Sequence, residues 1–128
     1  MEGTIVVVGA RGENNNAGAV YIFDTTTRAQ THKIVPSDTQ ADDRFGRSVG
    51  ISGSIIVAAS ASLNCERPGK VYVFDTSGNE LQILMSSDGV AGDCFGRSLD
   101  IDGNVVVVGA VKRIENSVAT GAAYLFFL

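Results

Sequence analysis

A 50-residue repeat dominates this sequence and limits the folds that it can adopt. The segment that begins Phe45-Gly46-Arg47-Ser48 returns 50 residues later as Phe95-Gly96-Arg97-Ser98. The second half of the repeat also occurs near the N-terminus, as Gly3-Thr4-Ile5-Val6-Val7-Val8-Gly9-Ala10. A repeat of this length that is built of short strands is typical of a propeller or a similar array.

Four short strands are predicted in the central copy of the repeat. They cover 46–51, 54–59, 70–75 and 80–85, and we name them strands A, B, C and D. Strand B is apolar without alternation, which predicts burial on both faces. Two-residue turns are expected between A and B, at Ser52-Gly53 and at Asp102-Gly103. Over the whole chain the pattern predicts strands B-C-D, A-B-C-D and A-B-C, and no helix.

These strands predict an all-β fold, a β-propeller built of four-stranded antiparallel blades, with about two and a half blades in the chain. We expect a partial blade in 1–44, a complete blade in 45–94 and a second partial blade in 95–128, which together form one propeller segment. Strand A should lie innermost, where crowding between blades explains the small residues Gly46, Ser48 and Gly50.

Charge and hydropathy exclude some classes of partner. The net charge of −4 disfavours nucleic acid, because phosphate binding needs a basic face. No apolar run approaches the roughly 20 residues of a membrane helix, so we expect no membrane insertion. The N-terminal residues lead directly into a strand and lack the pattern of a signal peptide.

Motifs for catalysis give little support to an enzyme. The sequence has no Walker loop and no His-Glu-x-x-His, and its Gly-x-Ser-x-Gly match, Gly46-Arg47-Ser48-Val49-Gly50, falls within predicted strand A. Its single histidine, His32, falls on a polar strand predicted at a sheet edge. We therefore expect no catalytic residues and no cofactor, with a propeller that forms part of an enzyme as a remote alternative.

The B–C loops differ in length between repeats and cover 11–17, 61–68 and 111–120. In a four-stranded meander these loops share one side with the D–A loops, and variable loops on one side often form a binding face. Loop drift without a binding role would give the same variation. The candidate residues of this face are Arg11, Glu13, Asn14, Asn64, Arg67, Lys112, Arg113 and Glu115.

The D–A loops 36–44 and 86–94 are acidic at repeating positions, with Asp38, Asp43, Asp88 and Asp93. We expect these side chains to cap backbone N–H groups and fix the turns, although carboxylates on one rim can also gather a cation or a basic partner. Arg47 and Arg97 follow the Phe-Gly pairs and are candidates for salt bridges with these carboxylates.

Two cysteines, Cys65 and Cys94, fall in neighbouring loops of the same predicted face. A disulfide between them is geometrically feasible and would suit an extracellular protein. The lack of an equivalent pair in the other repeats favours two free thiols.

At these residues the sequence resembles the FG-GAP repeat family, which forms the blades of integrin α-subunit propellers and of many bacterial surface proteins. The shared elements are the Phe-Gly pairs, the glycines that close strand B and the tyrosines of strand C: Phe45, Gly46, Phe95, Gly96, Gly9, Gly109, Tyr21, Tyr72 and Tyr124. The chain departs from the family pattern at Arg11, Ala61 and Val111, where proline is expected, and at Ala59-Ser60, which replaces Gly-Ala.

Integrin relatives also carry a calcium loop between strands A and B. Asp100 and Asp102 are the only weak candidates for such a site here, and the two-residue turn is too short to wrap calcium, which takes six to eight oxygens. A hairpin turn with an exposed Asp is therefore favoured over a metal site.

The resemblance implies an extracellular or cell-surface module that binds protein or glycan, as in adhesion. The alternative is a self-assembling structural unit whose partner is a second copy of the chain. We expect either a homodimer that completes a ring of about six blades or a chain that belongs to a longer propeller.

Overall fold

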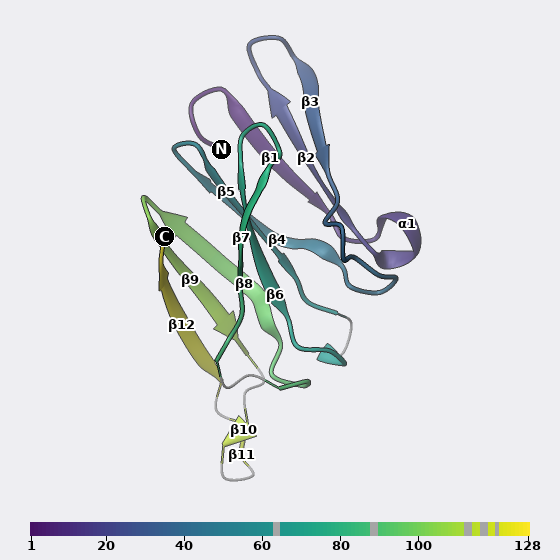
Figure 1. The fold of residues 1–128 in the computed structure, drawn as a ribbon, viewed down its shortest axis with the longest axis vertical. Helices are drawn as coiled ribbons and strands as arrows, with labels where there is room; N and C mark the ends of the chain where they lie inside the picture. The colour runs from purple at the N-terminus through teal and green to yellow at the C-terminus, as the bar shows by residue number, and fades with distance from the viewer. Residues whose placement is uncertain (63–64, 88–89, 112–113, 116–117, 120) are drawn as a thin grey trace.

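The protein folds into three antiparallel sheets that follow one another along the chain (Figure 1). A computed structural model describes residues 1–62, 65–87, 90–111, 114–115, 118–119 and 121–128. The strand orders are β1-β2-β3, β4-β5-β6-β7 and β12-β9-β8. This arrangement confirms the predicted series B-C-D, A-B-C-D and A-B-C, and each sheet is one blade of a partial propeller.

Strand bounds lie close to those predicted. The first blade contains β1 (Ile5–Ala10), β2 (Ala19–Asp24) and β3 (Ala29–Ile34). The central blade contains β4 (Phe45–Ser52), β5 (Ile55–Ser60), β6 (Lys70–Asp75) and β7 (Glu80–Leu84). The third blade contains β8 (Phe95–Asp102), β9 (Val105–Ala110) and β12 (Ala122–Phe127).

Two local predictions were wrong. The A–B turns are Gly53-Ser54 and Gly103-Asn104, one residue later than expected, because Ser52 still pairs with Ile55 and Asp102 with Val105. One short helical segment, α1 (Glu13–Asn16), occurs although no helix was predicted, and all three of its asparagines have positive φ values in the left-handed region.

A hydrophobic core fills each of the two junctions between neighbouring blades. β5 contributes to both cores, with Ile56 and Ala58 facing the first blade and Val57 and Ala59 facing the third. The predicted burial of strand B on both faces therefore holds in the central blade. In the outer blades one face has no neighbouring sheet among the described residues, and Val8 and Val107 are 44% and 41% exposed.

The repeated phenylalanine packs against two aromatic rings at each junction. The Phe45 ring meets Tyr72 and Phe74 edge-on, with centroids 5.5 and 5.9 Å apart. Phe95 repeats this contact with Tyr124 and Phe126 at 5.4 and 6.1 Å. Edge-to-face aromatic pairs add to the free energy of simple area burial, so both junctions gain the same specific stabilisation.

The glycine after each phenylalanine allows the chain to turn against the preceding blade. Gly46 and Gly96 have φ values of +88° and +90°, a region that favours glycine. Gly9 faces this turn so closely that an added Cβ would lie 2.0 Å from the Gly46 carbonyl oxygen. The Phe-Gly and Gly-Ala elements of the repeat are thus two halves of one packing contact.

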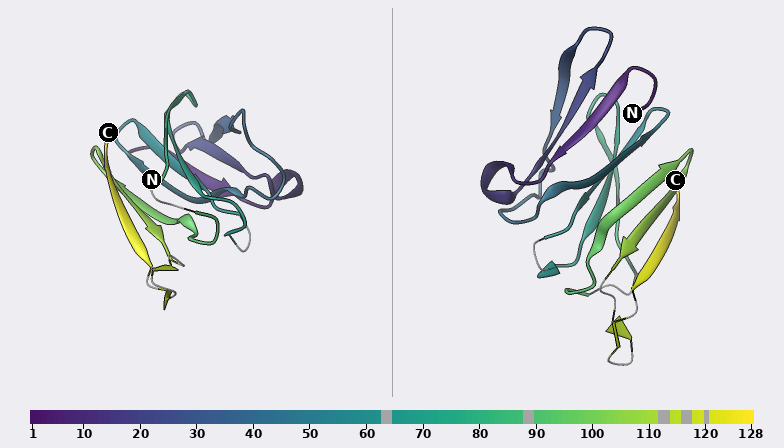
Figure 2. Two further views of the ribbon diagram at one scale, coloured as in Figure 1. Left: turned by 60° about the horizontal axis from the view of Figure 1, so that its bottom comes forward. Right: turned by 180° about the vertical axis from the view of Figure 1, so that it is seen from behind.

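Strands A of neighbouring blades lie next to each other, as their small residues indicated. Ser48 Oγ in β4 donates a hydrogen bond to the Gly96 carbonyl of β8 at 2.9 Å. A Cβ on Gly50 would lie 3.1 Å from Ile101 of β8. The chain reverses at both ends of these strands, and α1, the B–C and D–A loops and the β10–β11 hairpin gather at one end of the sheets (Figures 1 and 2).

The third B–C loop contains this additional hairpin, formed by β10 (Ile114–Glu115) and β11 (Val118–Ala119). In the part of the chain that the structure describes, no helix has the length and apolar character needed to cross a bilayer.

Candidate functional site: the Ser60 pocket

The loops of the predicted face contact each other at both blade junctions. The Asp42 N–H donates to the Asn15 carbonyl at 3.2 Å, and the Gly92 N–H donates to the Cys65 carbonyl at 2.6 Å. The two donors are 50 residues apart in the sequence, and so are the two acceptors. At both junctions the B–C loop is therefore fixed to the following D–A loop by a hydrogen bond that recurs with the repeat.

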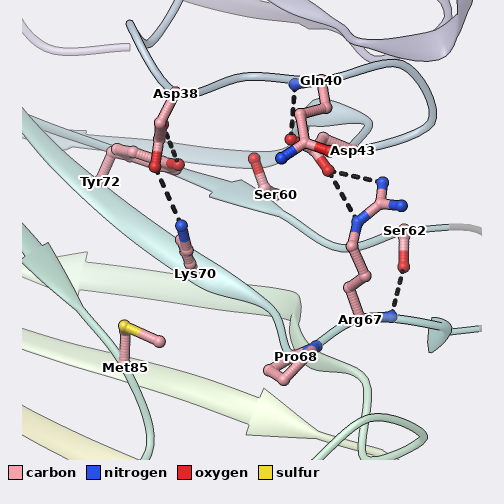
Figure 3. A pocket seen from close by; sticks show the side chains of 10 residues that line it. All are labelled: Asp38, Gln40, Asp43, Ser60, Ser62, Arg67, Pro68, Lys70, Tyr72 and Met85. Carbon is pink, nitrogen blue, oxygen red and sulfur yellow. Dashed lines mark hydrogen bonds and ion pairs between the residues drawn. The ribbon is translucent and has the colours of Figure 1, made fainter.

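A pocket of about 300 Å³ opens on this face, between the D–A loop 36–44 and the B–C loop of the central blade (Figure 3). We call it the Ser60 pocket. Polar side chains surround it, and Pro68 and Met85 supply apolar surface. Its other lining residues are Asp38, Gln40, Asp43, Ser60, Ser62, Arg67, Lys70 and Tyr72.

Two ion pairs border the Ser60 pocket, and both link the D–A loop to the central blade. Lys70 Nζ lies 2.9 Å from Asp38 Oδ2. Arg67 Nη2 lies 2.6 Å from Asp43 Oδ1, and it also donates to the Ala41 carbonyl at 3.1 Å. All four charged side chains are partly exposed, so the pairs contribute modestly to stability and mainly position the loop.

Tyr72 connects the pocket to the core beneath it. Its side chain is almost fully buried, and its hydroxyl donates to Asp38 Oδ1 at 2.8 Å. Burial, and then the hydrogen bond to Asp38, raises the pKa of Tyr72. Hydrogen bonds from Lys70 and Tyr72 lower the pKa of Asp38. At neutral pH the pocket therefore holds a carboxylate and a protonated phenol in fixed positions.

The Ser60 hydroxyl is the unusual group of the pocket. Ser60 is 8% exposed, and its buried Oγ has no hydrogen-bond partner among the described residues. In Figure 3 this oxygen lies between the Asp38 and Asp43 carboxylates. A buried hydroxyl without a partner costs about 1–3 kcal/mol, so the pocket contains a polar group that the fold itself leaves unsatisfied.

Ser60 is also a departure from the repeat. It lies opposite Lys70 on the neighbouring strand, whereas the first and third blades have alanine pairs at this register, Ala10 with Ala19 and Ala110 with Ala122. Two small apolar residues are thus replaced by a hydroxyl and an ammonium group in the central blade alone. A comparison of the repeats position by position would have found this pair from the sequence.

A family profile described as the FG-GAP repeat matches residues 29–74 and 79–126, which is more than half of the chain. The chain belongs to the FG-GAP repeat family. Each matched segment begins at strand D of one blade and ends at strand C of the next, so the FG-GAP unit spans a blade junction and includes its Phe-Gly turn. No curated protein matches this FG-GAP chain.

Of the eight predicted face residues, Arg67 is the one that the structure places in the Ser60 pocket. Arg11 and Asn14 are exposed at α1, away from it. Glu13 pairs with Lys33 and accepts a hydrogen bond from Tyr21. Asn64, Lys112 and Arg113 lie outside the described residues, and Glu115 is described only as part of strand β10.

The repeated aspartates divide between two roles. Asp43 accepts a hydrogen bond from the Gln40 N–H at 2.8 Å, and Asp93 accepts one from the Val90 N–H at 3.2 Å, so both cap their loops as expected. Asp38 instead pairs with Lys70, and Asp88 lies outside the described residues. We expected Arg47 to pair with these carboxylates. Instead, Asp38 pairs with Lys70 and Asp43 pairs with Arg67.

The cysteines differ from the free-thiol expectation. Cys65 and Cys94 form a disulfide, with Cα atoms 5.0 Å apart. They occupy the positions that Asn15 and Arg44 hold in the preceding repeat, where both residues likewise have positive φ values. The loops of the repeat already bring these two backbone positions together, and the cysteines add a covalent bond.

Asp100 and Asp102, the weak calcium candidates, lie on β8. Asp100 Oδ1 accepts a hydrogen bond from the Ile101 N–H at 2.9 Å. Among the described residues no group of three or more His, Cys, Asp and Glu side chains is arranged to hold a metal ion.

Proposed function

We propose that this FG-GAP chain is a non-catalytic binding module of the extracellular or cell-surface space. Its partner, a protein or a glycan, is held on the face that contains the Ser60 pocket. The observation that carries the proposal is the Ser60 hydroxyl, a buried group in the wall of the pocket that has no hydrogen-bond partner among the described residues. A ligand on this face would satisfy that hydroxyl.

The chemistry of the pocket supports binding more than catalysis. A serine nucleophile needs a neighbouring base to accept its proton. Lys70 lies opposite Ser60 on the neighbouring strand, but its ammonium group is paired with Asp38. The disulfide supports the extracellular assignment, since such bonds persist in oxidising compartments.

The test is a binding screen of the full chain against a glycan array and a panel of purified extracellular proteins. The decisive variant is Ser60→Ala with Lys70→Ala, which restores the alanine pair of the other blades. Ser54→Ala is the matched control, because Ser54 is exposed at the opposite end of β5. A ligand that binds the protein and the control but not the double variant supports the proposal. A ligand that binds all three equally contradicts it.

A second candidate function is self-assembly, and exposed apolar residues on the third blade favour it. Leu125 and Phe127 are 60% and 74% exposed on the outward face of β12. In the central blade the position of Leu125 is taken by Val73, which is buried against the third blade. A second copy that covers this face would form a homodimer of about six blades. Light scattering at micromolar concentration tests it, and a monomeric mass would exclude it.

A further inference from the structure

We infer that the Ser60 pocket binds a single neutral sugar residue. This inference rests on the proposed function and specifies its ligand. Three properties of the pocket support it: its size, its balance of charge and the kinds of hydrogen bond that it leaves open.

The size of the pocket indicates a small ligand. At about 300 Å³ it lies at the lower limit of ligand pockets, which range from roughly 300 to 1,000 Å³. A stable protein partner buries about 800 Å² on each side, so it would have to contact the surrounding loops as well as the pocket. One ring is the unit that matches the available space.

The charges of the pocket indicate a neutral ligand. Asp38 and Asp43 are balanced by Lys70 and Arg67, and each acid contacts one base within 3 Å. A charged ligand would have to compete with one of these pairs and leave the other member without its counterion. A neutral ligand can bind while both pairs stay intact.

The open hydrogen-bonding positions indicate hydroxyl groups. The Ser60 hydroxyl can both donate and accept, and the paired carboxylates keep free lone pairs. Lys70 has three N–H groups, so donors remain after it binds Asp38. Each sugar hydroxyl also donates and accepts, and the C–H groups of the ring can contact Pro68 and Met85.

The repeat explains why this site occurs in the central blade. The alanine pairs Ala10–Ala19 and Ala110–Ala122 offer neither a donor nor an acceptor from their side chains. The Ser60–Lys70 pair changes this position without altering the strand register. Ser60→Ala therefore removes the hydroxyl and keeps a side chain that the fold accepts twice elsewhere.

The experiment is an NMR titration of the full chain with D-glucose, D-galactose and D-mannose. D-Glucuronate and D-glucosamine are the charged probes, and they have the same six-membered ring as the neutral sugars. At least one neutral hexose is expected to shift resonances of the pocket at millimolar concentration, and to bind more tightly than both charged probes. Ser60→Ala should weaken that binding about tenfold, the effect of losing one hydrogen bond, whereas Ser54→Ala should leave it unchanged.

The inference is overturned if no hexose binds, if a charged probe binds more tightly than the neutral ones, or if Ser60→Ala binds as well as the unaltered protein. A protein ligand that binds this face, and that Arg67→Ala releases, would overturn the sugar assignment while the proposed function stands. If neither hexoses, array glycans nor protein ligands bind, both are wrong.

Discussion

The carbonyl oxygen of Phe95 lies against Gly69 so closely that a Cβ on Gly69 would come within 1.7 Å of it. Gly69 precedes strand C of the central blade, and Phe95 begins strand A of the next. The equivalent pair at the first junction is Gly18 and Phe45, where the distance is 2.0 Å. The glycine before strand C therefore packs directly against the backbone of the following blade.

Gly69→Ala should destabilise the protein by more than about 3 kcal/mol, because the collision is with backbone that cannot rotate away. Urea unfolding monitored by circular dichroism measures the loss. Gly12→Ala is the control, since its Cβ would have 3.7 Å to the nearest atom and its φ is −91°. Equal stability of the two variants would contradict the close approach.

Phe95→Ala should cost about 3–5 kcal/mol, the usual range for a buried phenylalanine. Phe95 is 2% exposed and contacts two aromatic rings of β12. Phe127→Ala removes the same side chain from a position that is 74% exposed, and its effect on the free energy of unfolding should stay within about 0.5 kcal/mol. A large loss at Phe127 would show instead that this face is covered in solution.

Ser60→Ala should leave the free energy of unfolding unchanged or raise it by up to about 1 kcal/mol, because it removes an unsatisfied buried hydroxyl. The reverse change, Ala110→Ser, places a hydroxyl at a fully buried position of the third blade and should cost about 1–3 kcal/mol. Urea midpoints of both variants decide the comparison. A clear loss of stability in Ser60→Ala would mean that the hydroxyl has a partner within the folded protein.

Replacing both Cys65 and Cys94 by serine should lower the free energy of unfolding by about 2–4 kcal/mol. The disulfide closes a loop with a sequence separation of 29 residues and so restricts the unfolded chain. Thermal melts with and without a reducing agent give the same comparison in the unaltered protein. The melting temperature of the double serine variant should not change with the reductant. If the melting temperature of the unaltered protein does not change either, the result would argue against the disulfide.

Acid should weaken the contact between the D–A loop and the central blade through Asp38. Because Lys70 and Tyr72 lower the pKa of Asp38, its contribution is complete above the pKa of the unfolded chain and is lost as pH falls through the folded value. Urea midpoints measured from about pH 6 down to about pH 2 should fall more steeply for the protein than for Asp38→Asn. Parallel curves would show that Asp38 does not titrate differently in the two states.

The strand architecture could be predicted because the repeat carries its own evidence. Phe45 and Phe95 mark strand A, Tyr72 and Tyr124 mark strand C, and burial on both faces of β5 follows from its apolar run. These features depend on local sequence and on a neighbour of the same kind, and the period of 50 residues supplies both.

The pocket and the disulfide could not be predicted in the same way. Asp38 and Lys70 meet only because a loop of one repeat folds over the strands of the next, and the pair has no counterpart in the other blades. Cys65 and Cys94 also occur once, so the repeat gave no sign that their positions coincide. The asparagines of α1 adopt left-handed backbone angles, which a strand-based pattern does not detect.

The hydrogen bonds from Asp42 to Asn15 and from Gly92 to Cys65 recur at the same step as the Phe-Gly turns. The loop hydrogen bond and the Phe-Gly turn of a blade junction are therefore both encoded within one period. Duplication of a single 50-residue segment would insert a blade that can form the same junction contacts with both of its neighbours. A gene with this repeat can therefore gain or lose whole blades while the contacts between neighbouring blades are retained.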